Sequence, residues 1–79
     1  IMQINMAIAQ TIRELRTKNK VSQEILAEAI DSHQVYISEI EHGKKIPSIP
    51  VIYSIARYFD LSLSEFFAYI DLRLYFRTI

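Results

Sequence analysis

The sequence predicts an all-α fold of five short helices. The chain has 79 residues but only one glycine and two prolines, too few turn residues for an all-β protein with a turn about every 8–12 residues. Apolar residues instead recur three and four positions apart, the spacing that places them on one face of a helix. Serine residues also precede three of these apolar stretches, where a hydroxyl group can cap the N-terminus of a helix.

Composition excludes several classes of protein. The chain has no cysteine, so disulfides and thiolate zinc sites are excluded. A domain of this length buries only about 60% of the surface that its unfolded form exposes. We therefore expect extra stability from a core rich in apolar residues and from a second subunit. The longest apolar run, residues 66–70, is far shorter than the roughly 20 residues that span a bilayer. With no secretory signal in the sequence, we expect a cytoplasmic protein without membrane contact.

Charge is distributed unevenly along the chain, although nine basic and nine acidic residues give a formal net charge of zero. Residues 1–20 and 42–58 are basic. Residues 21–41 have no lysine or arginine and contain the acidic residues Glu24, Glu28, Asp31, Glu39 and Glu41. Any anion-binding surface must therefore be built from the two basic segments.

The first two helices are predicted from apolar spacing and a cap. The first has Ile8, Ile12 and Leu15 on its inner face and ends near residues 19–20. Ser22 is placed to cap the second helix, because its hydroxyl can accept hydrogen bonds from the backbone N–H groups that follow. The apolar positions of the second helix are Ile25, Leu26, Ala29 and Ile30.

A third helix is predicted from Gln34 to His42, after a three-residue break at residues 31–33. On a helical wheel, Ile37 and Ile40 point inward. The outward positions are Gln34, Val35, Ser38, Glu39 and His42. Gly43 follows where a left-handed residue commonly ends a helix, and residues 44–47 form a basic loop.

Caps also mark the last two helices. Ser48 precedes the fourth helix, whose first turn tolerates Pro50. The buried face of this helix is predicted to contain Val51, Ile52, Ile55, Ala56 and Phe59. Ser62 and Glu65 have the spacing of a capping box for the fifth helix. Residues 71–79 fit either an extension of this helix, which we favour, or an edge strand. The aromatic residues near this end are expected in the core and partly in a subunit interface.

A short helix that follows another after a three-residue turn has the geometry of a DNA-binding helix-turn-helix. The sequence reads IRELR at 12–16, VSQEILAE at 21–28, YISEIEHGKKIPS at 36–48 and IA at 55–56. With these residues the chain resembles the Cro/CI-type (XRE-like) family of phage and bacterial repressors over residues 8–67. The resemblance implies a lambda-repressor-like fold with a helix-turn-helix at residues 23–42. We expect residues 68–79 to be a C-terminal extension that takes part in dimerisation.

The resemblance also implies roles for individual residues. Contacts with DNA bases are expected from Gln34, Val35, Ser38 and Glu39. Contacts with DNA phosphates are expected from Gln23, His33, His42, Lys44 and Lys45. A structural ion pair is expected between Arg16 and Glu41. The glutamine can pair with adenine and the valine can cover a thymine methyl group.

Three positions in the turn depart from the family pattern, and one of them is Ser32, which stands where an apolar residue is common. Asp31 replaces the usual glycine, and aspartate tolerates the left-handed region better than most residues. His33 stands where a serine or threonine cap is common, so Ser32 can cap the third helix one residue early. Two histidines without a third ligand make a poor zinc site, so no metal or cofactor is expected.

These features together predict a sequence-specific DNA-binding transcriptional regulator in the cytoplasm of a bacterium or in a phage. We expect a repressor that binds a palindromic operator in double-stranded DNA as a homodimer. We do not expect an enzyme, because the chain lacks a cysteine nucleophile and a glycine-rich phosphate loop. The alternative is an antitoxin-like or coactivator-like module of the same fold that binds a protein, such as a toxin.

Overall fold

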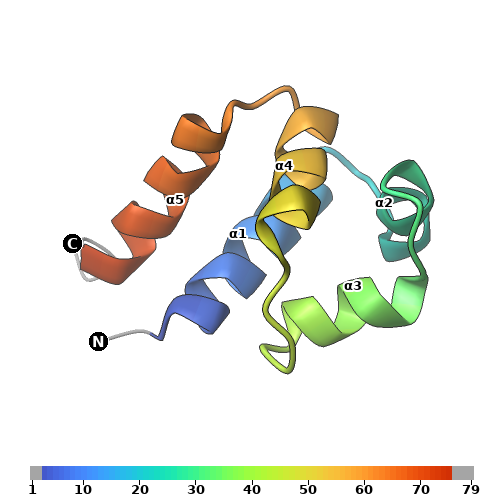
Figure 1. Cartoon of the computed structure of the whole chain (residues 1–79), viewed down its shortest axis with the longest axis horizontal. Coiled ribbons are helices and arrows are strands. Elements are labelled where there is room, and N and C mark those ends of the chain that lie inside the picture. Colours follow the sequence, from blue (N-terminus) through green and yellow to red (C-terminus); the bar gives the residue numbers. More distant parts are fainter. Residues whose placement is uncertain (1–2, 76–79) are drawn as a thin grey trace.

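The computed structural model describes residues 3–75, and within this range the chain folds into five α-helices without a strand (Figure 1). The helices are α1 (Ile4–Lys18), α2 (Gln23–Ala29), α3 (Gln34–Glu41), α4 (Ile49–Tyr58) and α5 (Leu63–Tyr75). The predicted all-α fold class is therefore confirmed. The long helix α1 contacts both α3 and α5, while α2 packs on α3. The two helices of the predicted helix-turn-helix thus lie together at one end of the molecule (Figure 1).

Side-chain caps start three of the helices as the sequence predicts. The hydroxyl of Ser22 accepts a hydrogen bond from the Ile25 N–H at 3.0 Å. Ser48 caps α4 in the same manner through the N–H of Val51. At the start of α5, the Ser62 hydroxyl accepts from the Glu65 N–H at 3.0 Å. The Glu65 carboxylate accepts from the Ser62 N–H at 2.8 Å, which completes the capping box.

Helix α3 begins differently, and the prediction that Ser32 caps it one residue early is wrong. The N-cap position is His33, whose side chain makes no capping hydrogen bond. The Ser32 N–H is already used at the end of α2, where it donates to the Ala27 carbonyl at 2.8 Å. The first hydrogen bonds of α3 run from the Tyr36 and Ile37 N–H groups to the His33 carbonyl, at 3.0 and 3.4 Å. This places the N-cap at His33, so α3 starts at Gln34.

The first four helices end in the same motif. The second residue after each of these helices has a positive φ: Lys20 (57°), Asp31 (57°), Gly43 (74°) and Asp60 (62°). The N–H of the next residue then donates to a carbonyl five positions back, from Val21 to Arg16 at 2.9 Å in the first case. The positive-φ residue also donates to a carbonyl three positions back, as Lys20 does to Thr17 at 3.1 Å. The two hydrogen bonds together are those of the Schellman motif. The left-handed conformation predicted for Asp31 is confirmed.

The core is formed by apolar residues from all five helices. Ile37 and Ile40 are fully buried beneath α3, as the wheel predicts. Ile25 is 50% exposed and Ala29 is also exposed, so two of the four apolar positions of the second helix do not face the core. The buried residues Leu26 and Ala27 define the inner face of α2. Ile25 lies on the opposite side because one residue turns a helix by about 100°.

Helix α5 continues without a break across the predicted domain boundary between residues 67 and 68. The helical alternative for the tail is confirmed as far as Tyr75, and residues 76–79 lie outside the described range. Ile70 is buried in the core. Arg73 holds the end of the helix against α1 through the Glu14 carboxylate and the Gln10 carbonyl. The C-terminal part of α5 is therefore packed on the domain.

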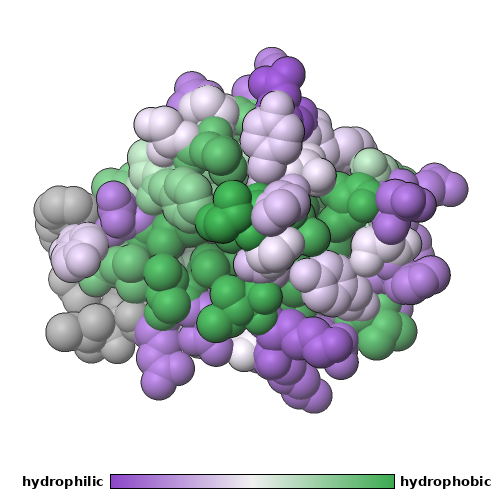
Figure 2. All heavy atoms as spheres, in the orientation of Figure 1, coloured by the Kyte–Doolittle hydropathy of each residue, from purple (hydrophilic) through white to green (hydrophobic). Residues whose placement is uncertain are grey.

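Apolar side chains also cover part of the outer surface. Figure 2 shows hydrophobic residues gathered between α5 and the start of α4, with hydrophilic residues around the rim. Large apolar side chains that are more than half exposed include Ile4, Ile46, Ile49, Tyr53, Leu72 and Tyr75. Among the described helices, none combines the length and the apolar character needed to cross a membrane.

Candidate nucleic-acid interface

Helix α3 presents an accessible outer face of four polar residues and one valine over two fully buried isoleucines. Val35 is 63% exposed, and His42 is also exposed just beyond the last residue of the helix. Gln34, Ser38 and Glu39 are each partly exposed. The four residues predicted to contact bases therefore share one accessible side of a short helix, which is the arrangement that major-groove recognition needs.

A buried carboxylate joins α3 to α1. The Glu41 side chain is fully buried. Arg16 donates from Nε to Glu41 Oε2 at 2.7 Å and from Nη2 to Oε1 at 3.0 Å. It also donates from Nη1 to the Val21 carbonyl at 3.0 Å. The fork of the guanidinium thus holds both carboxylate oxygens, and the ion pair fixes the C-terminal end of α3 on α1.

The same contacts set the charge state of the pair. Burial acts to raise the pKa of Glu41, but hydrogen bonds from Arg16 and Gln23 and the positive charge of Arg16 outweigh it and lower that pKa. The hydrogen bond to Glu41 raises the pKa of Arg16 in turn, against the opposing effect of burial. Both groups are therefore charged at neutral pH, as a stable buried ion pair requires.

Gln23 connects this ion pair to the N-terminus of α3. Its Nε2 donates to Glu41 Oε1 at 3.0 Å, and its Oε1 accepts from Gln34 Nε2. A carboxylate can only accept, so the amide nitrogen of Gln23 must face Glu41 and its oxygen must face Gln34. The chain of contacts from Arg16 to Gln34 therefore fixes the orientation of both glutamine amides.

Sequence reasoning named all four members of this chain but did not predict that Gln23 joins them. It also missed Arg13, which donates to Glu41 Oε1 at 3.4 Å. The signal for Arg13 was present, because it precedes Arg16 by three positions and so lies on a neighbouring face of the same helix. The contact between Gln23 and Gln34 depends on how α2 crosses α3, which spacing alone does not give.

The basic loop after α3 exposes Lys44 and Lys45. Lys45 Nζ lies 3.3 Å from Glu39 Oε1, so two residues predicted to contact DNA pair with each other. An exposed pair of this kind contributes at most about 1 kcal/mol to stability. A DNA phosphate can therefore compete with Glu39 for this lysine.

The two histidines lie at opposite ends of α3. His42 Nδ1 is 2.7 Å from the Ser38 carbonyl oxygen. A carbonyl only accepts, so Nδ1 carries the proton and Nε2 is left for other partners. His33 is exposed at the N-cap position. Among residues 3–75, no group of three side chains with metal-binding chemistry comes together.

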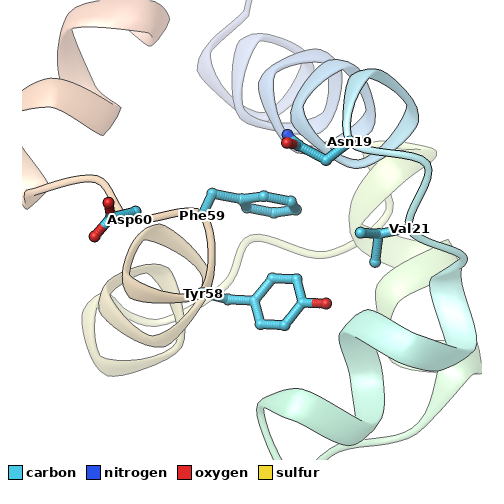
Figure 3. Close-up of a pocket in the computed structure, with 5 residues that line it drawn as sticks. All are labelled: Asn19, Val21, Tyr58, Phe59 and Asp60. Carbon is cyan, nitrogen blue, oxygen red and sulfur yellow. The ribbon is translucent and has the colours of Figure 1, made fainter.

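A pocket of about 300 Å³ lies away from these residues, between the C-terminal ends of α1 and α4 (Figure 3). It is lined by Asn19, Val21, Tyr58, Phe59 and Asp60. Figure 3 shows the two aromatic rings reaching toward Val21, while the Asp60 carboxylate points away from them. None of the residues predicted to contact DNA lines this pocket, so it is separate from the candidate interface.

Comparison with known sequences agrees with this geometry. A helix-turn-helix family model matches residues 12–66, more than half of the chain. An uncharacterized HTH-type transcriptional regulator of Archaeoglobus fulgidus is 37% identical over 60 residues, which cover 76% of this chain and 86% of that relative. A second regulator of the same description and organism is 34% identical over 58 residues, covering 73% and 82% of the two chains.

Two solved structures share the fold. Both are crystal structures of the clp gene regulator ClgR from Corynebacterium glutamicum. One has a TM-score of 0.88 at 22% identity and covers 98% of this chain and 82% of its own. The other has a TM-score of 0.81 at 24% identity and covers 89% and 90% of the two chains. At such low identity the likeness concerns the fold alone.

Proposed function

Since the chain belongs to the helix-turn-helix family of DNA-binding transcriptional regulators, we propose that it recognises one operator sequence by inserting α3 into the major groove. The observation that carries this proposal is the hydrogen-bonded chain from Glu41 through Gln23 to Gln34. A side chain that reads a base must be held in one orientation before it meets DNA. The buried carboxylate provides that support.

The hydrogen bonds left free on Gln34 match those of adenine. Its Nε2 has two hydrogens, of which one is donated to Gln23. The second hydrogen can be donated to adenine N7, while Oε1 accepts from the N6 amino group. Gln34 can therefore bind adenine through both groups without releasing Gln23. Val35, two-thirds exposed beside it, is suited to contact with a thymine methyl group.

Contacts with phosphates are proposed around this helix. Gln23 donates one Nε2 hydrogen to Glu41, which leaves the second for a phosphate oxygen. His33, His42, Lys44 and Lys45 are the other proposed contacts, as the family resemblance implies. Each neutralised phosphate releases counterions, so log K should fall with log salt concentration by about 0.9 per ionic contact.

We propose a homodimer as the form that binds DNA. Ala68, Leu72 and Tyr75 are exposed at spacings of four and three along α5, so they form one stripe on its outer face. If two copies pack this stripe antiparallel, the small Ala68 side chain lies opposite the large Tyr75 ring of the second copy. Two-fold symmetry would then present two α3 helices to half-sites about 34 Å apart on a palindrome. A dimer on such a site is suited to act as a repressor.

Selection from a pool of random duplexes tests the proposal. The parent chain is expected to enrich a palindrome that contains adenine at one position of each half-site. Gln34→Ala should lose discrimination at that position by about 1–3 kcal/mol, whereas Lys44→Ala should weaken all sites and lower the salt slope by about one. If no sequence is enriched and a protein co-purifies with the chain, the protein-binding alternative replaces this proposal.

A further inference from the structure

The peptide group that joins Gly43 to Lys44 is held at both of its polar ends. Its carbonyl oxygen, on Gly43, accepts a hydrogen bond from Asn5 Nδ2 at 2.8 Å. Its N–H, on Lys44, donates to the Glu39 carbonyl at 2.9 Å. The first bond comes from α1 and the second from α3, so two helices fix the plane of a single peptide in the basic loop.

Gly43 lets α1 approach this peptide closely. Its φ is +74°, in the left-handed region that favours glycine. A Cβ atom at this position would collide with the Met6 sulfur. The first turn of α1 therefore packs directly against the loop backbone through Asn5 and Met6.

Fixing this peptide also fixes the direction in which the following side chains leave the backbone. The plane of the Gly43–Lys44 peptide sets one backbone torsion of each residue, and Lys44 is exposed immediately beyond it. The N–H of Lys45 adds a longer bond of 3.3 Å to the Glu39 carbonyl. The two lysines are thus presented from an ordered backbone, which reduces the conformational entropy lost when they bind an anion.

We propose that Asn5 is a positioning residue for DNA-backbone binding, which acts by orienting the loop that carries Lys44 and Lys45. This inference rests on the proposed function, because it assumes that the loop binds phosphates. Asn5 is partly buried and donates one amide N–H to the Gly43 carbonyl. It lies before residue 12, where the family match begins, so the comparison with the family does not assign it a role.

The test compares Asn5→Ala with the parent chain in equilibrium binding to a random-sequence duplex at several salt concentrations. Loss of one well-placed phosphate contact should weaken binding about fivefold at 0.15 M salt and lower the salt slope by up to about 0.9. Asn19→Ala is the matched control. Asn19 Nδ2 also donates to a backbone carbonyl, that of Leu15 at 2.7 Å, but at the opposite end of α1. The control should bind as the parent does.

A double-mutant cycle separates positioning from a general structural effect. In a Lys44→Ala, Lys45→Ala background, Asn5→Ala should cause no further loss of affinity, because the side chains it orients are gone. An equal loss in both backgrounds would overturn the inference. Asn5→Leu has a similar volume without a donor and should reproduce the loss if Asn5→Ala folds poorly. Hydrogen exchange of the Lys44 amide should accelerate in either variant, while exchange in the middle of α1 stays unchanged.

The outcomes distinguish the inference from the proposed function. If the parent chain fails to bind any duplex, both are rejected. If the parent binds and Asn5→Ala and Asn5→Leu bind with the same affinity and salt slope, only the role of Asn5 is rejected.

Discussion

The outward faces of α3 and α5 are organised in opposite ways. On α3, Gln34 is polar and is held in place by a chain of hydrogen bonds that ends on a buried carboxylate. On α5, Leu72 and Tyr75 are apolar and mostly exposed, at 53% and 73%. Hydrogen bonds to a base depend on direction, so the groups on α3 that form them must be oriented before DNA binds. Association of two copies depends on apolar area, so the groups on α5 need only be accessible.

Substitutions on the two faces are therefore expected to affect different properties of the protein. Support for α3 comes from the core, so breaking it should destabilise the fold. The stripe on α5 lies outside the core, so changing it should affect assembly without unfolding the chain.

The largest effect is expected from Arg16→Met, which removes the cation but retains most of the aliphatic stem. The Glu41 carboxylate is then left buried with only weaker partners, and breaking a buried pair costs roughly 3–5 kcal/mol. Urea unfolding measures this loss. Lys45→Met breaks the exposed pair with Glu39 and serves as the control, with an expected change below about 1 kcal/mol. Equal losses in the two variants would contradict the support assigned to Glu41.

A smaller effect is expected from Leu72→Lys on α5. A charge at the centre of an apolar interface should weaken dimerisation by about 2 kcal/mol or more. Sedimentation should then show a monomer at concentrations where the parent chain is a dimer. The unfolding free energy of the monomer should stay within about 0.5 kcal/mol, because this side chain is half exposed. Ser64→Lys, on an exposed position one turn before the stripe, is the control. A parent chain that sediments as a monomer would refute the role of α5.

The pH dependence of the unfolding free energy tests the role of Glu41 in holding α3. Because the folded state lowers the pKa of Glu41, the unfolded chain binds a proton at this group more readily than the folded chain. The stability from Glu41 is therefore fully present above the ordinary carboxyl pKa of about 4.3 and is lost as pH falls through the lower folded value. The unfolding free energy should decline over this acid range, and less steeply in Glu41→Gln. Parallel declines would exclude Glu41 as a source of the acid sensitivity.

The smallest effect on stability is expected at the C-terminal end of α1, which is part of neither the α3 face nor the α5 face. Lys20 has a φ of 57° after α1, a conformation that costs roughly 1–2 kcal/mol for an L-residue and little for glycine. Lys20→Gly should raise the unfolding free energy by about 1 kcal/mol or slightly less, since glycine also gains entropy in the unfolded chain. Lys18→Gly, inside the last turn of α1, should instead lower it by up to about 1 kcal/mol. A loss in both variants would show that the left-handed residue carries no strain.

The sequence was sufficient for the helices because their determinants are local. Ser22, Ser48 and Ser62 each cap the helix that follows, and these hydroxyls act on N–H groups only three residues away. The exposure of Ile25 was not predictable from hydrophobicity, because a seven-residue helix has too few positions to define its inner face. Burial there is decided by the packing of α2 on α3.

The candidate site was predictable as a set of residues but not as a network. The family resemblance named Gln23, Gln34 and Glu41 individually. The bond from Gln23 to Gln34 joins residues on different helices, and the bond from Asn5 to Gly43 spans 38 positions. Contacts of this kind depend on where helices cross, which no local pattern contains.

The central claim is that Gln23 holds Gln34 in the orientation that reads a base. The most direct test measures binding to the selected duplex and to a duplex with its key adenine replaced, for the parent, Gln34→Ala, Gln23→Leu and the double variant. We expect Gln23→Leu to reduce discrimination by about 1 kcal/mol in the parent and to have no effect on discrimination once Gln34 is removed. Full discrimination in Gln23→Leu, or an equal loss in both backgrounds, would contradict the claim.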